Sequence, residues 1–321
     1  MDVEEKISLV KRNAVEIITE EELRLLLETK KKPVVYCGYE PSGPLHLGHF
    51  TTITKLMDFE KAGFNVIVLL ADVHALLNRK GDEKFIKAQV SAWKKTIKAI
   101  GLGAKIVLGS SFQFKKDYTL DVMKMSQNIT IKRGLRSMQE VGRDMEHATI
   151  SQMLYPLMQV EDIKFLGCDV SYGGLEQRKI HMLAREMSEV INHKPIIVHT
   201  PLITSLKGPG GKMSSSIPGS NISVLDSDEK VKSLLAKAYC PIKEVKDNPI
   251  LQIAKLIILP NFGEILIERP EKYGGNISFD NFEELKKEYA SGKLHPADLK
   301  KSVATYIIKL ISPIRKNFES L

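Results

Sequence analysis

Short apolar runs alternate with amphipathic segments over the first two-thirds of the chain. Four runs rich in β-branched residues predict strands at 34–39, 65–70, 105–108 and 195–199. The run at 65–70 is continuously apolar, which is typical of a strand buried on both faces of a sheet. Helical patterns are found at about 20–30, 46–62, 83–100 and, more loosely, 118–158. This alternation predicts an α/β fold with a parallel sheet covered by helices.

The pattern changes beyond a loop at 206–220. Four helical patterns follow, at 227–239, 249–258, 281–290 and 297–317, and no strong strand pattern is left. We therefore expect a domain boundary near residues 221–226, with a mostly helical domain after it.

The length and composition fit about two globular domains. With 321 residues, 43% of them hydrophobic, the chain can bury a substantial core, which excludes intrinsic disorder. Its apolar runs are far shorter than the roughly 20 residues of a membrane-spanning helix, and its N-terminus has no secretory signal pattern. The cysteines, Cys37, Cys168 and Cys240, form neither a disulfide framework nor a zinc pattern. These features predict a cytoplasmic protein that is not bound to a membrane.

The net charge of +8 favours a polyanionic partner. Residues 221–321 contain 16 Lys and Arg against 14 Asp and Glu, so most of the positive excess lies earlier in the chain. Individually placed residues, and not a polybasic arm, would therefore hold any nucleic acid.

The first candidate motif, Pro41 to His49, lies between a predicted strand and a predicted helix and contains His46, Gly48 and His49. A helix N-terminus offers free N–H groups to a phosphate, and two imidazoles one turn apart can add donors. Gly48 would let a nucleotide approach the backbone. Two alternatives stay open: a metal site, for which a third ligand at suitable spacing is missing, or ordinary core or solvated histidines.

The second candidate motif is the glycine-rich segment 208–216, which includes Lys212 and three serines. It is not a P-loop, because Leu206 stands where the first glycine belongs and Met213 follows the lysine where Ser or Thr is needed. Alone, it fits a flexible surface loop equally well. Together, His-x-Gly-His after the first strand and Lys-Met-Ser-x-Ser after the last strand are a specific pair.

This pair resembles the two signatures of class I aminoacyl-tRNA synthetases. Further segments resemble archaeal tyrosyl-tRNA synthetases and extend the similarity over essentially the whole chain: 36–43, 70–75, 155–163, 173–181 and 294–300. The resemblance implies a Rossmann-type catalytic domain at 1–221, with an inserted acceptor-stem and dimer segment at about 112–150, and an anticodon-binding domain at 222–321. It also implies a homodimer. Ser215 replaces the second lysine of the general class pattern, as is ordinary in archaeal and eukaryotic tyrosine enzymes.

The implied reaction attaches L-tyrosine to tRNA(Tyr) through a tyrosyl-adenylate made from ATP. His46 and His49 would meet the phosphates, and Lys212 would close over the leaving pyrophosphate. The residues implied in ATP binding are Gly48, Lys212, Met213, Ser214 and Ser215. Mg²⁺ would arrive with ATP, and neither a tightly bound cofactor nor a dedicated protein metal site is expected.

The resemblance also implies a tyrosine pocket. Tyr36 and Asp162 match the residues that bind the phenol hydroxyl, while Gly38 and His74 line the pocket. The α-amino group is held in the family by residues that match Tyr155, Gln159 and Gln177. Spacings of four and three place Tyr155, Gln159 and Asp162 on one face of a helix. Taken singly, Tyr36 also fits a buried strand tyrosine, Asp162 a surface helix residue and His74 a satisfied core histidine.

Contacts with tRNA are implied in both expected domains. Arg178 would contact the first base pair, and Asp298, with Tyr273 and His295 nearby, would read the first anticodon base. Asp298 alternatively fits an acidic residue that stabilises a helix N-terminus. A basic cluster in the inserted segment, from which we take Arg136 as a tRNA contact, fits either acceptor-stem contact and subunit packing or a solvated helix face: Lys132, Arg133, Arg136 and Arg143.

Three rival functions share part of this pattern. Tryptophanyl-tRNA synthetases have both signatures, but an indole N–H only donates, whereas the Tyr36 hydroxyl and the Asp162 carboxylate suit a phenol that donates and accepts. An RNA-binding protein without catalysis would have lost His46, His49 or Lys212. A small-molecule nucleotidyltransferase would not need the helical tail.

Overall fold

The computed structural model describes residues 1–142 and 144–321, so Arg143 of the basic cluster lies outside the described residues. The chain forms two compact units. The first comprises residues 1–42, 55–94 and 102–201, and the second comprises 43–54, 95–101 and 202–321. Residues 43–49 of the first motif therefore belong to the same unit as the glycine-rich loop.

A six-stranded sheet forms the centre of the first unit, in the order β1-β6-β5-β2-β3-β4. All neighbours are parallel except β1 and β6, which are antiparallel. The strands are β1 (Glu16–Ile18), β2 (Val34–Tyr39), β3 (Asn65–Leu70), β4 (Lys105–Leu108), β5 (Val170–Gly174) and β6 (Ile196–Thr200). The α/β prediction is confirmed, and the four predicted strands are present. The hydrophobic pattern did not predict β1 or β5.

The strand order reverses beside β2. From β2 the chain proceeds outward through β3 to β4 and then returns to β5 on the other side of β2. Ligands of open α/β sheets bind outside the carboxyl ends of the strands at such a switch point. Tyr36 pairs with Ser171 of β5 there, and β2 ends at Tyr39.

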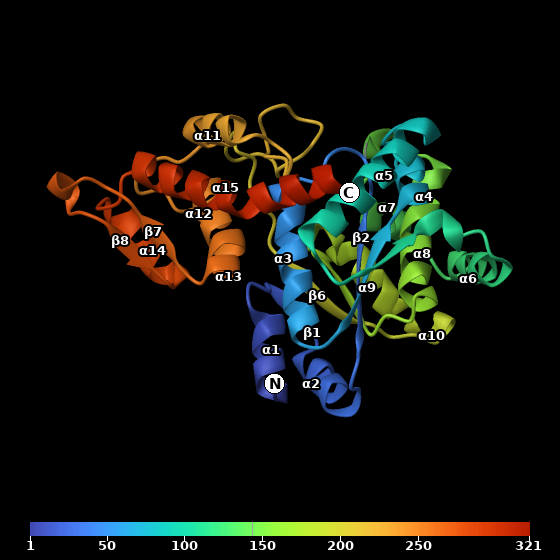
Figure 1. Ribbon diagram of the computed structural model, residues 1–321. Helices are drawn as coiled ribbons and strands as arrows, with labels where there is room; N and C mark the ends of the chain where they lie inside the picture. Colours follow the sequence, from blue (N-terminus) through green and yellow to red (C-terminus); the bar gives the residue numbers. More distant parts are fainter. Residues whose placement is uncertain (143) are drawn as a thin grey trace. The chain divides into compact units, whose positions relative to one another are not determined.

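Helices flank this sheet (Figure 1). They are α1 (Val3–Lys11), α2 (Glu20–Thr29), α4 (Asp72–Leu77), α6 (Lys116–Ser126), α7 (Ile131–Met138), α8 (Ile150–Phe165), α9 (Arg178–Glu186) and α10 (Ser188–Ile191). Two further helices, α3 (Leu47–Lys61) and α5 (Glu83–Ile100), have residues in both units. Thr19 and Glu22 form the capping box that starts α2.

The hydrophobic core beside β2 and β3 is built mainly by α6, α8 and α9. Apolar side chains from these helices pack around Tyr36 and Leu69, including Tyr118, Val160 and Leu183. The expected strand buried on both faces is present, because five of the six residues of β3 are buried.

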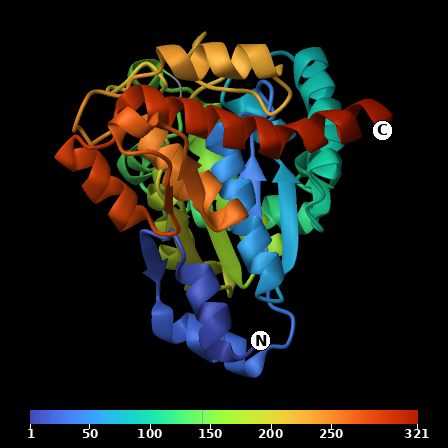
Figure 2. The ribbon, with the colours of Figure 1, turned by 60° about the vertical axis from the view of Figure 1, so that its left-hand side comes forward.

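The second unit is mainly helical beyond residue 202. Its helices are α11 (Asp228–Lys237), α12 (Pro249–Ile253), α13 (Leu259–Phe262), α14 (Phe282–Ser291) and α15 (Pro296–Ser320). The two ribbon views show α11 running alongside α15 (Figures 1 and 2). We expected no strong strand in this part of the chain, and this expectation is wrong in one place. There β7 (Ile265–Ile267) and β8 (Ile277–Phe279) form an antiparallel hairpin. These three-residue strands are too short to give a strong alternating pattern.

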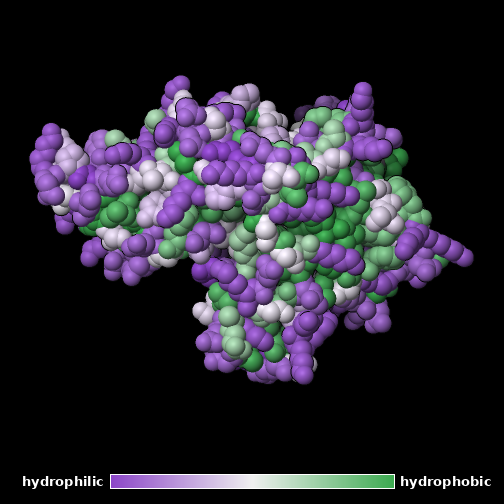
Figure 3. All heavy atoms as spheres, viewed as in Figure 1, coloured by the Kyte–Doolittle hydropathy of each residue, from purple (hydrophilic) through white to green (hydrophobic). Residues whose placement is uncertain are grey.

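The surface of both units carries many hydrophilic side chains on the face drawn in Figure 3. Among the described residues, no helix combines the length and apolar character required to cross a bilayer.

Candidate active site

The first motif is fixed by pairing with a distant segment of the second unit. Leu47 N–H donates to the Ile222 carbonyl at 2.9 Å, and Val224 N–H donates to the Leu45 carbonyl at 3.1 Å. His46 and Ser223 form an antiparallel bridge between these bonds. The segment that follows the glycine-rich loop is thereby held against the start of α3.

The two motif histidines stack at the start of α3, with ring centroids 3.8 Å apart. Gly48 N–H donates to Nδ1 of His46 at 3.1 Å, so in the neutral ring the proton lies on Nε2. Burial, with a smaller effect from the Lys212 charge, lowers the pKa of His46 to about 4. His46 is therefore a neutral imidazole whose Nε2–H is a donor at physiological pH.

Glycine at position 48 permits this packing. A Cβ there would lie 2.9 Å from Cε1 of His46 and 3.2 Å from Cβ of Met213. Gly43 provides similar room, because a Cβ at that position would lie 2.6 Å from Oγ of Ser215. The two motifs therefore approach each other at two points where only a glycine fits without displacement.

The glycine-rich loop is a hairpin whose ends are paired. Ser205 N–H donates to the Gly211 carbonyl at 2.9 Å, and Met213 N–H donates to the Ile203 carbonyl at 3.1 Å. Gly208 and Gly210, with φ of +106° and +102°, supply the left-handed turns that side chains rarely tolerate. Met213 is buried and Lys212 is exposed, so the hairpin anchors one side chain and presents the other.

Hydroxyl groups brace the serine run beyond the lysine. Ser214 Oγ lies 2.9 Å from Ser216 Oγ, and the Ser214 carbonyl accepts a hydrogen bond from Ser220 Oγ at 2.7 Å. Ser214 and Ser215 are partly exposed. The structure thus brings together every residue that the sequence assigned to ATP: His46, Gly48, His49, Lys212, Met213, Ser214 and Ser215.

A second polar cluster lies in the core of the first unit. Asp162 of α8 is fully buried, and its carboxylate accepts hydrogen bonds from Gln113 Nε2 at 2.8 and 3.1 Å and from the Tyr118 hydroxyl at 2.8 Å. Burial raises the pKa of Asp162 to about 7, although these two donors favour the carboxylate and oppose the shift. Tyr36 is also buried, and burial together with the nearby Asp162 charge raises its pKa.

The Asp162 cluster leaves buried polar atoms unsatisfied. His74 Nδ1 lies 3.2 Å from Gln113 Nε2, and its Nε2 lies 3.8 Å from Asp162 Oδ2, beyond hydrogen-bond distance. His74 Nε2 and Gln113 Oε1 have no hydrogen-bond partner. Burial lowers the pKa of His74 to about 4, so the ring is neutral. Unpaired buried groups are costly, and a ligand that carries a hydroxyl can satisfy them.

Gln113 and Tyr118 are the functional candidates that the sequence reasoning missed. Both precede α8 by more than thirty residues, and both bond to Asp162 only because the fold brings them there. They lie in no motif with recognisable spacing. Only a residue-by-residue comparison with relatives could have pointed to them.

The remaining predicted pocket residues line the same region. Tyr155 packs edge-on against His74 with ring centroids 4.5 Å apart, and burial together with the nearby Glu40 charge raises the pKa of its hydroxyl. Gln159 Nε2 donates to Gln177 Oε1 at 3.2 Å. A Cβ at Gly38 would lie 2.9 Å from the Tyr36 hydroxyl, so glycine at this position leaves room for the side chain of Tyr36.

Known proteins match the whole of this arrangement. The family described as "tRNA synthetases class I (W and Y)" matches residues 28–312. The tyrosine--tRNA ligase of Archaeoglobus fulgidus is 52% identical over 320 residues, which is 98% of each chain, and that of Methanopyrus kandleri is 48% identical over 320 residues and 98% of each chain. The crystal structure of the Archaeoglobus fulgidus tyrosyl-tRNA synthetase complexed with L-tyrosine superimposes with a TM-score of 0.95 at 51% identity, covering 99% of this chain and 100% of that chain.

The chain belongs to the class I tRNA synthetases. As a class I synthetase it must bind tRNA. The basic side chains predicted to contact tRNA differ in whether they already form ion pairs within the chain. Arg178 makes a bidentate ion pair with Glu16, with N–O distances of 2.8 to 3.0 Å. Arg133 pairs with Glu186, whereas Arg136 and Lys132 are exposed and make no ion pair with any described residue.

In the second unit, two of the residues predicted to contact the anticodon, His295 and Asp298, lie at the start of α15, and a third, Tyr273, precedes β8. His295 caps the helix, since its Nδ1 accepts a hydrogen bond from Ala297 N–H at 3.1 Å. Pro296 occupies the first turn as expected, and Asp298 follows it, half-buried. Tyr273 is 62% exposed, with the Lys272 ammonium 5.0 Å from the centre of its ring.

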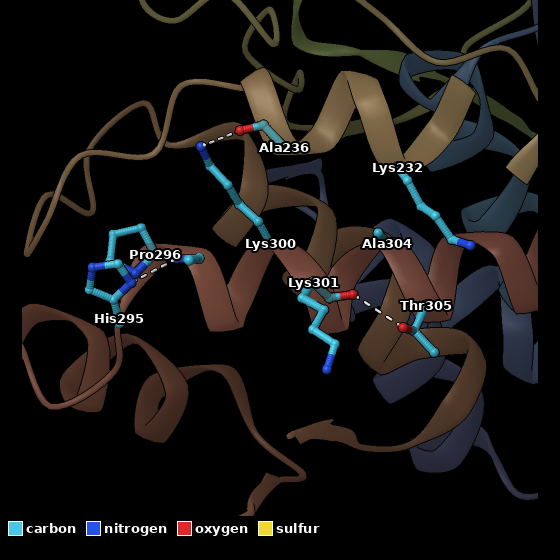
Figure 4. A pocket seen from close by; sticks show the side chains of 9 residues that line it. Lys232, Ala236, His295, Pro296, Lys300, Lys301, Ala304 and Thr305 are labelled. Carbon is cyan, nitrogen blue, oxygen red and sulfur yellow. Dashed lines mark hydrogen bonds between the residues drawn. The ribbon is translucent and has the colours of Figure 1, made fainter. Parts of the chain in front are cut away.

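A groove of about 570 Å³ runs between α11 and α15 from His295. Its floor consists of small or apolar residues, and three lysines extend around it: Lys232, Lys300 and Lys301 (Figure 4). Lys300 Nζ donates to the Ala236 carbonyl at 3.1 Å, and Lys301 Nζ lies 3.6 Å from a Glu268 carboxylate oxygen.

Among the residues that the structure describes, no group of three or more His, Cys, Asp or Glu is placed to hold a metal ion.

Proposed function

We propose that this chain attaches L-tyrosine to tRNA(Tyr) in two steps, with ATP as the energy source. The tyrosine carboxylate first attacks the α-phosphorus of ATP, which forms tyrosyl-adenylate and releases pyrophosphate. The terminal ribose hydroxyl of tRNA then attacks the tyrosyl carbonyl and releases AMP. Membership of the class I tRNA synthetases and relatives of about 50% identity named as tyrosine--tRNA ligases support this activity.

Specificity for tyrosine rests on the Asp162 cluster, which is the observation that carries the proposal. A phenol hydroxyl beside it donates to the Asp162 carboxylate and accepts from a neighbouring donor such as Tyr36 or Gln113. The buried, unpaired atoms of His74 and Gln113 are the kind of groups that a polar ligand satisfies. Phenylalanine would leave them unpaired, and the indole of tryptophan has no acceptor. The tryptophan alternative is therefore not favoured.

The α-amino and carboxyl end of tyrosine lies toward Tyr155, Gln159 and Gln177. The hydrogen bond between Gln159 and Gln177 fixes the rotamers of both amides. The Glu40 carboxylate beside the Tyr155 hydroxyl adds a negative charge that suits an ammonium group. The Lys80 ammonium lies 3.3 Å from Glu40 and tempers that charge.

The phosphates of ATP are bound by the stacked histidines and the glycine-rich hairpin. Neutral His46 donates from Nε2, and the backbone N–H groups at the start of α3 add partial positive charge. Lys212, on the exposed side of the hairpin, meets the charge that develops on the leaving pyrophosphate. Mg²⁺ arrives with ATP and neutralises phosphate charge. No side chain acts as a nucleophile, so positioning and electrostatics provide the catalysis.

Recognition of tRNA uses residues of both units. Arg178 and Arg136 contact the acceptor end, and Asp298 accepts hydrogen bonds from the N1–H and amino group of the first anticodon guanine. Tyr273 provides a stacking surface for that unstacked base. The groove between α11 and α15 supports this placement, because its lysines suit the phosphates that flank a bound loop nucleotide. We assign residues 1–221 to catalysis and 222–321 to anticodon binding, and we expect a cytoplasmic homodimer.

The decisive experiment measures exchange of labelled pyrophosphate into ATP with each of the twenty amino acids. Exchange with tyrosine alone is the expected result. Exchange that depends on tryptophan, or no exchange with any amino acid, would contradict the proposal. Charging of tRNA(Tyr) with labelled tyrosine then tests the second step. A protein that only binds RNA would bind tRNA(Tyr) but fail in both assays.

A further inference from the structure

Two buried, stacked histidines have no part in the proposed reaction. His199 of β6 is fully buried, and His181 of α9 is almost so. His199 pairs in register with Glu16 of β1 on one side and with Gly173 of β5 on the other. Residues directly opposite each other on neighbouring strands project to the same face of a sheet, so this row brings Glu16 and His199 together and leaves a space over Gly173.

Hydrogen bonds connect the row to the surface. His199 Nδ1 lies 3.0 Å from Glu16 Oε2, and His181 Nδ1 lies 3.0 Å from His199 Nε2. The two rings are nearly parallel, with an interplanar angle of 14°. At its outer end Glu16 holds Arg178 by the bidentate ion pair. The chain Arg178–Glu16–His199–His181 therefore runs without a break from an exposed guanidinium into the core.

The carboxylate sets the direction of every bond in this chain. Burial lowers the pKa of both histidines, so both rings are neutral and each has one N–H. The Glu16 carboxylate only accepts, so the His199 proton lies on Nδ1. His199 Nε2 must then accept, which places the His181 proton on Nδ1. A change at Glu16 thus affects both rings together.

The inner end of the chain and Gln177, a residue of the proposed pocket, both lie against Gly173. A Cβ at Gly173 would lie 3.0 Å from Cγ of Gln177 and 3.3 Å from Cε1 of His181. The two side chains therefore share the space that the missing Cβ leaves, and they are also one helical turn apart. A shift of the His181 ring changes the room available to Gln177, which bonds to Gln159 in the pocket.

We propose that Glu16, His199 and His181 form a positioning relay that couples engagement of Arg178 by tRNA to the Gln177 side of the tyrosine pocket. This inference rests on the proposed function, which supplies the roles of Arg178 and Gln177. The outer pair is the part that can change, because Arg178 is 47% and Glu16 25% exposed, and ion pairs this accessible contribute little stability. When RNA binds Arg178, the ion pair between Arg178 and Glu16 breaks. Glu16 keeps its hydrogen bond to His199 and re-orients toward it, and the rings of His199 and His181 shift with it.

The test compares the KM for tyrosine in pyrophosphate exchange with and without saturating tRNA(Tyr) whose 3′-terminal ribose has been oxidised by periodate. Oxidised tRNA binds but cannot accept tyrosine, so only the first step is observed. In the wild type we expect the KM to change by roughly fivefold or more, within the usual range for coupled sites. In His199→Phe, which removes both ring nitrogens, we expect the change to fall below about twofold. His199→Gln, which keeps a donor and an acceptor, should restore part of it.

Two further variants separate coupling from folding. Glu16→Gln alters the relay at its more accessible end and should also reduce the change in KM. His193→Phe is the matched control, because His193 hydrogen-bonds to the Cys168 carbonyl outside the relay, and it should keep the wild-type ratio. A wild type that exchanges with tyrosine but whose KM ignores tRNA would overturn the relay and leave the proposed function intact. So would Glu16→Gln and His199→Phe variants that retain the wild-type ratio. Absence of tyrosine-dependent exchange in the wild type would overturn both.

Discussion

Replacement of Asp162 by asparagine tests the tyrosine pocket most directly. The substitution keeps the size of the side chain but removes the charge and turns one acceptor into a donor. In the structure that carboxylate faces two donors, Gln113 Nε2 and the Tyr118 hydroxyl, and it is fully buried. The amide would therefore place an N–H₂ group against at least one other donor.

The expected loss follows from the hydrogen bond that the phenol of tyrosine makes to the carboxylate. A hydrogen bond to a charged group contributes about 1.5–3 kcal/mol, and each 1.4 kcal/mol is a factor of ten. The value of kcat/KM for tyrosine should thus fall by roughly 10- to 150-fold. Phenylalanine makes no such bond, so its kcat/KM should change by less than about threefold. The preference for tyrosine over phenylalanine falls accordingly.

The assay is pyrophosphate exchange with each amino acid over a full concentration range, accompanied by a thermal melt. Glu161→Gln is the matched control, because Glu161 is the adjacent, equally buried carboxyl on α8, and burial raises its pKa to about 7 as well. This control should keep the wild-type preference. If Asp162→Asn kept it too, or lost activity equally toward both amino acids, Asp162 would not bind the phenol.

Three further predictions concern other parts of the chain. Lys212→Ala should slow adenylate formation by ~10²–10³-fold at saturating ATP and tyrosine while the Kd for tyrosine stays unchanged; rapid-quench kinetics measure this, and an unaltered rate would remove Lys212 from the mechanism. Because burial raises the pKa of Asp162 to about 7, the fraction of molecules with an ionised Asp162 that can accept a hydrogen bond from the phenol rises with pH. The value of kcat/KM for tyrosine should therefore increase between about pH 6 and pH 8. A pH profile that Asp162→Asn leaves unchanged would argue against this origin. Asp298→Ala should raise the KM for tRNA in aminoacylation and spare pyrophosphate exchange; if a tRNA lacking the first anticodon guanine penalises wild type and variant equally, Asp298 does not read that base.

The hydrophobic pattern predicted a strand correctly where the strand's own residues carry the signal. The strand β3 is apolar from Val66 to Leu70 because both of its faces are covered there, and the sequence shows this run directly. In contrast, β5 reads Val-Ser-Tyr-Gly-Gly, which resembles a turn, yet all five residues are buried because β2 and β6 pair with it on either side. Similarly, β1 has three half-buried residues and exists only as the antiparallel partner of β6.

The candidate site likewise has features that the sequence shows and contacts that only the fold creates. The two motifs could be proposed for phosphate binding because their residue types and spacings can be read from the chain itself, and because the pair together resembles the signatures of a known family. Which atoms meet depends on pairing between distant residues, such as Leu47 with Ile222, and on glycines that admit a neighbouring side chain.

The sequence alone therefore determined the fold class and, through its resemblance to a family, the residues that we propose for ATP and tyrosine binding. Tertiary structure alone decided that Gln113 and Tyr118 hold Asp162, that burial moves the pKa of this carboxyl to about 7, and that Glu16 pairs with Arg178. The reason is physical. Hydrophobic periodicity and motif spacing reflect interactions between near neighbours, whereas hydrogen-bond partners and desolvation depend on which remote segments the packed core brings into contact.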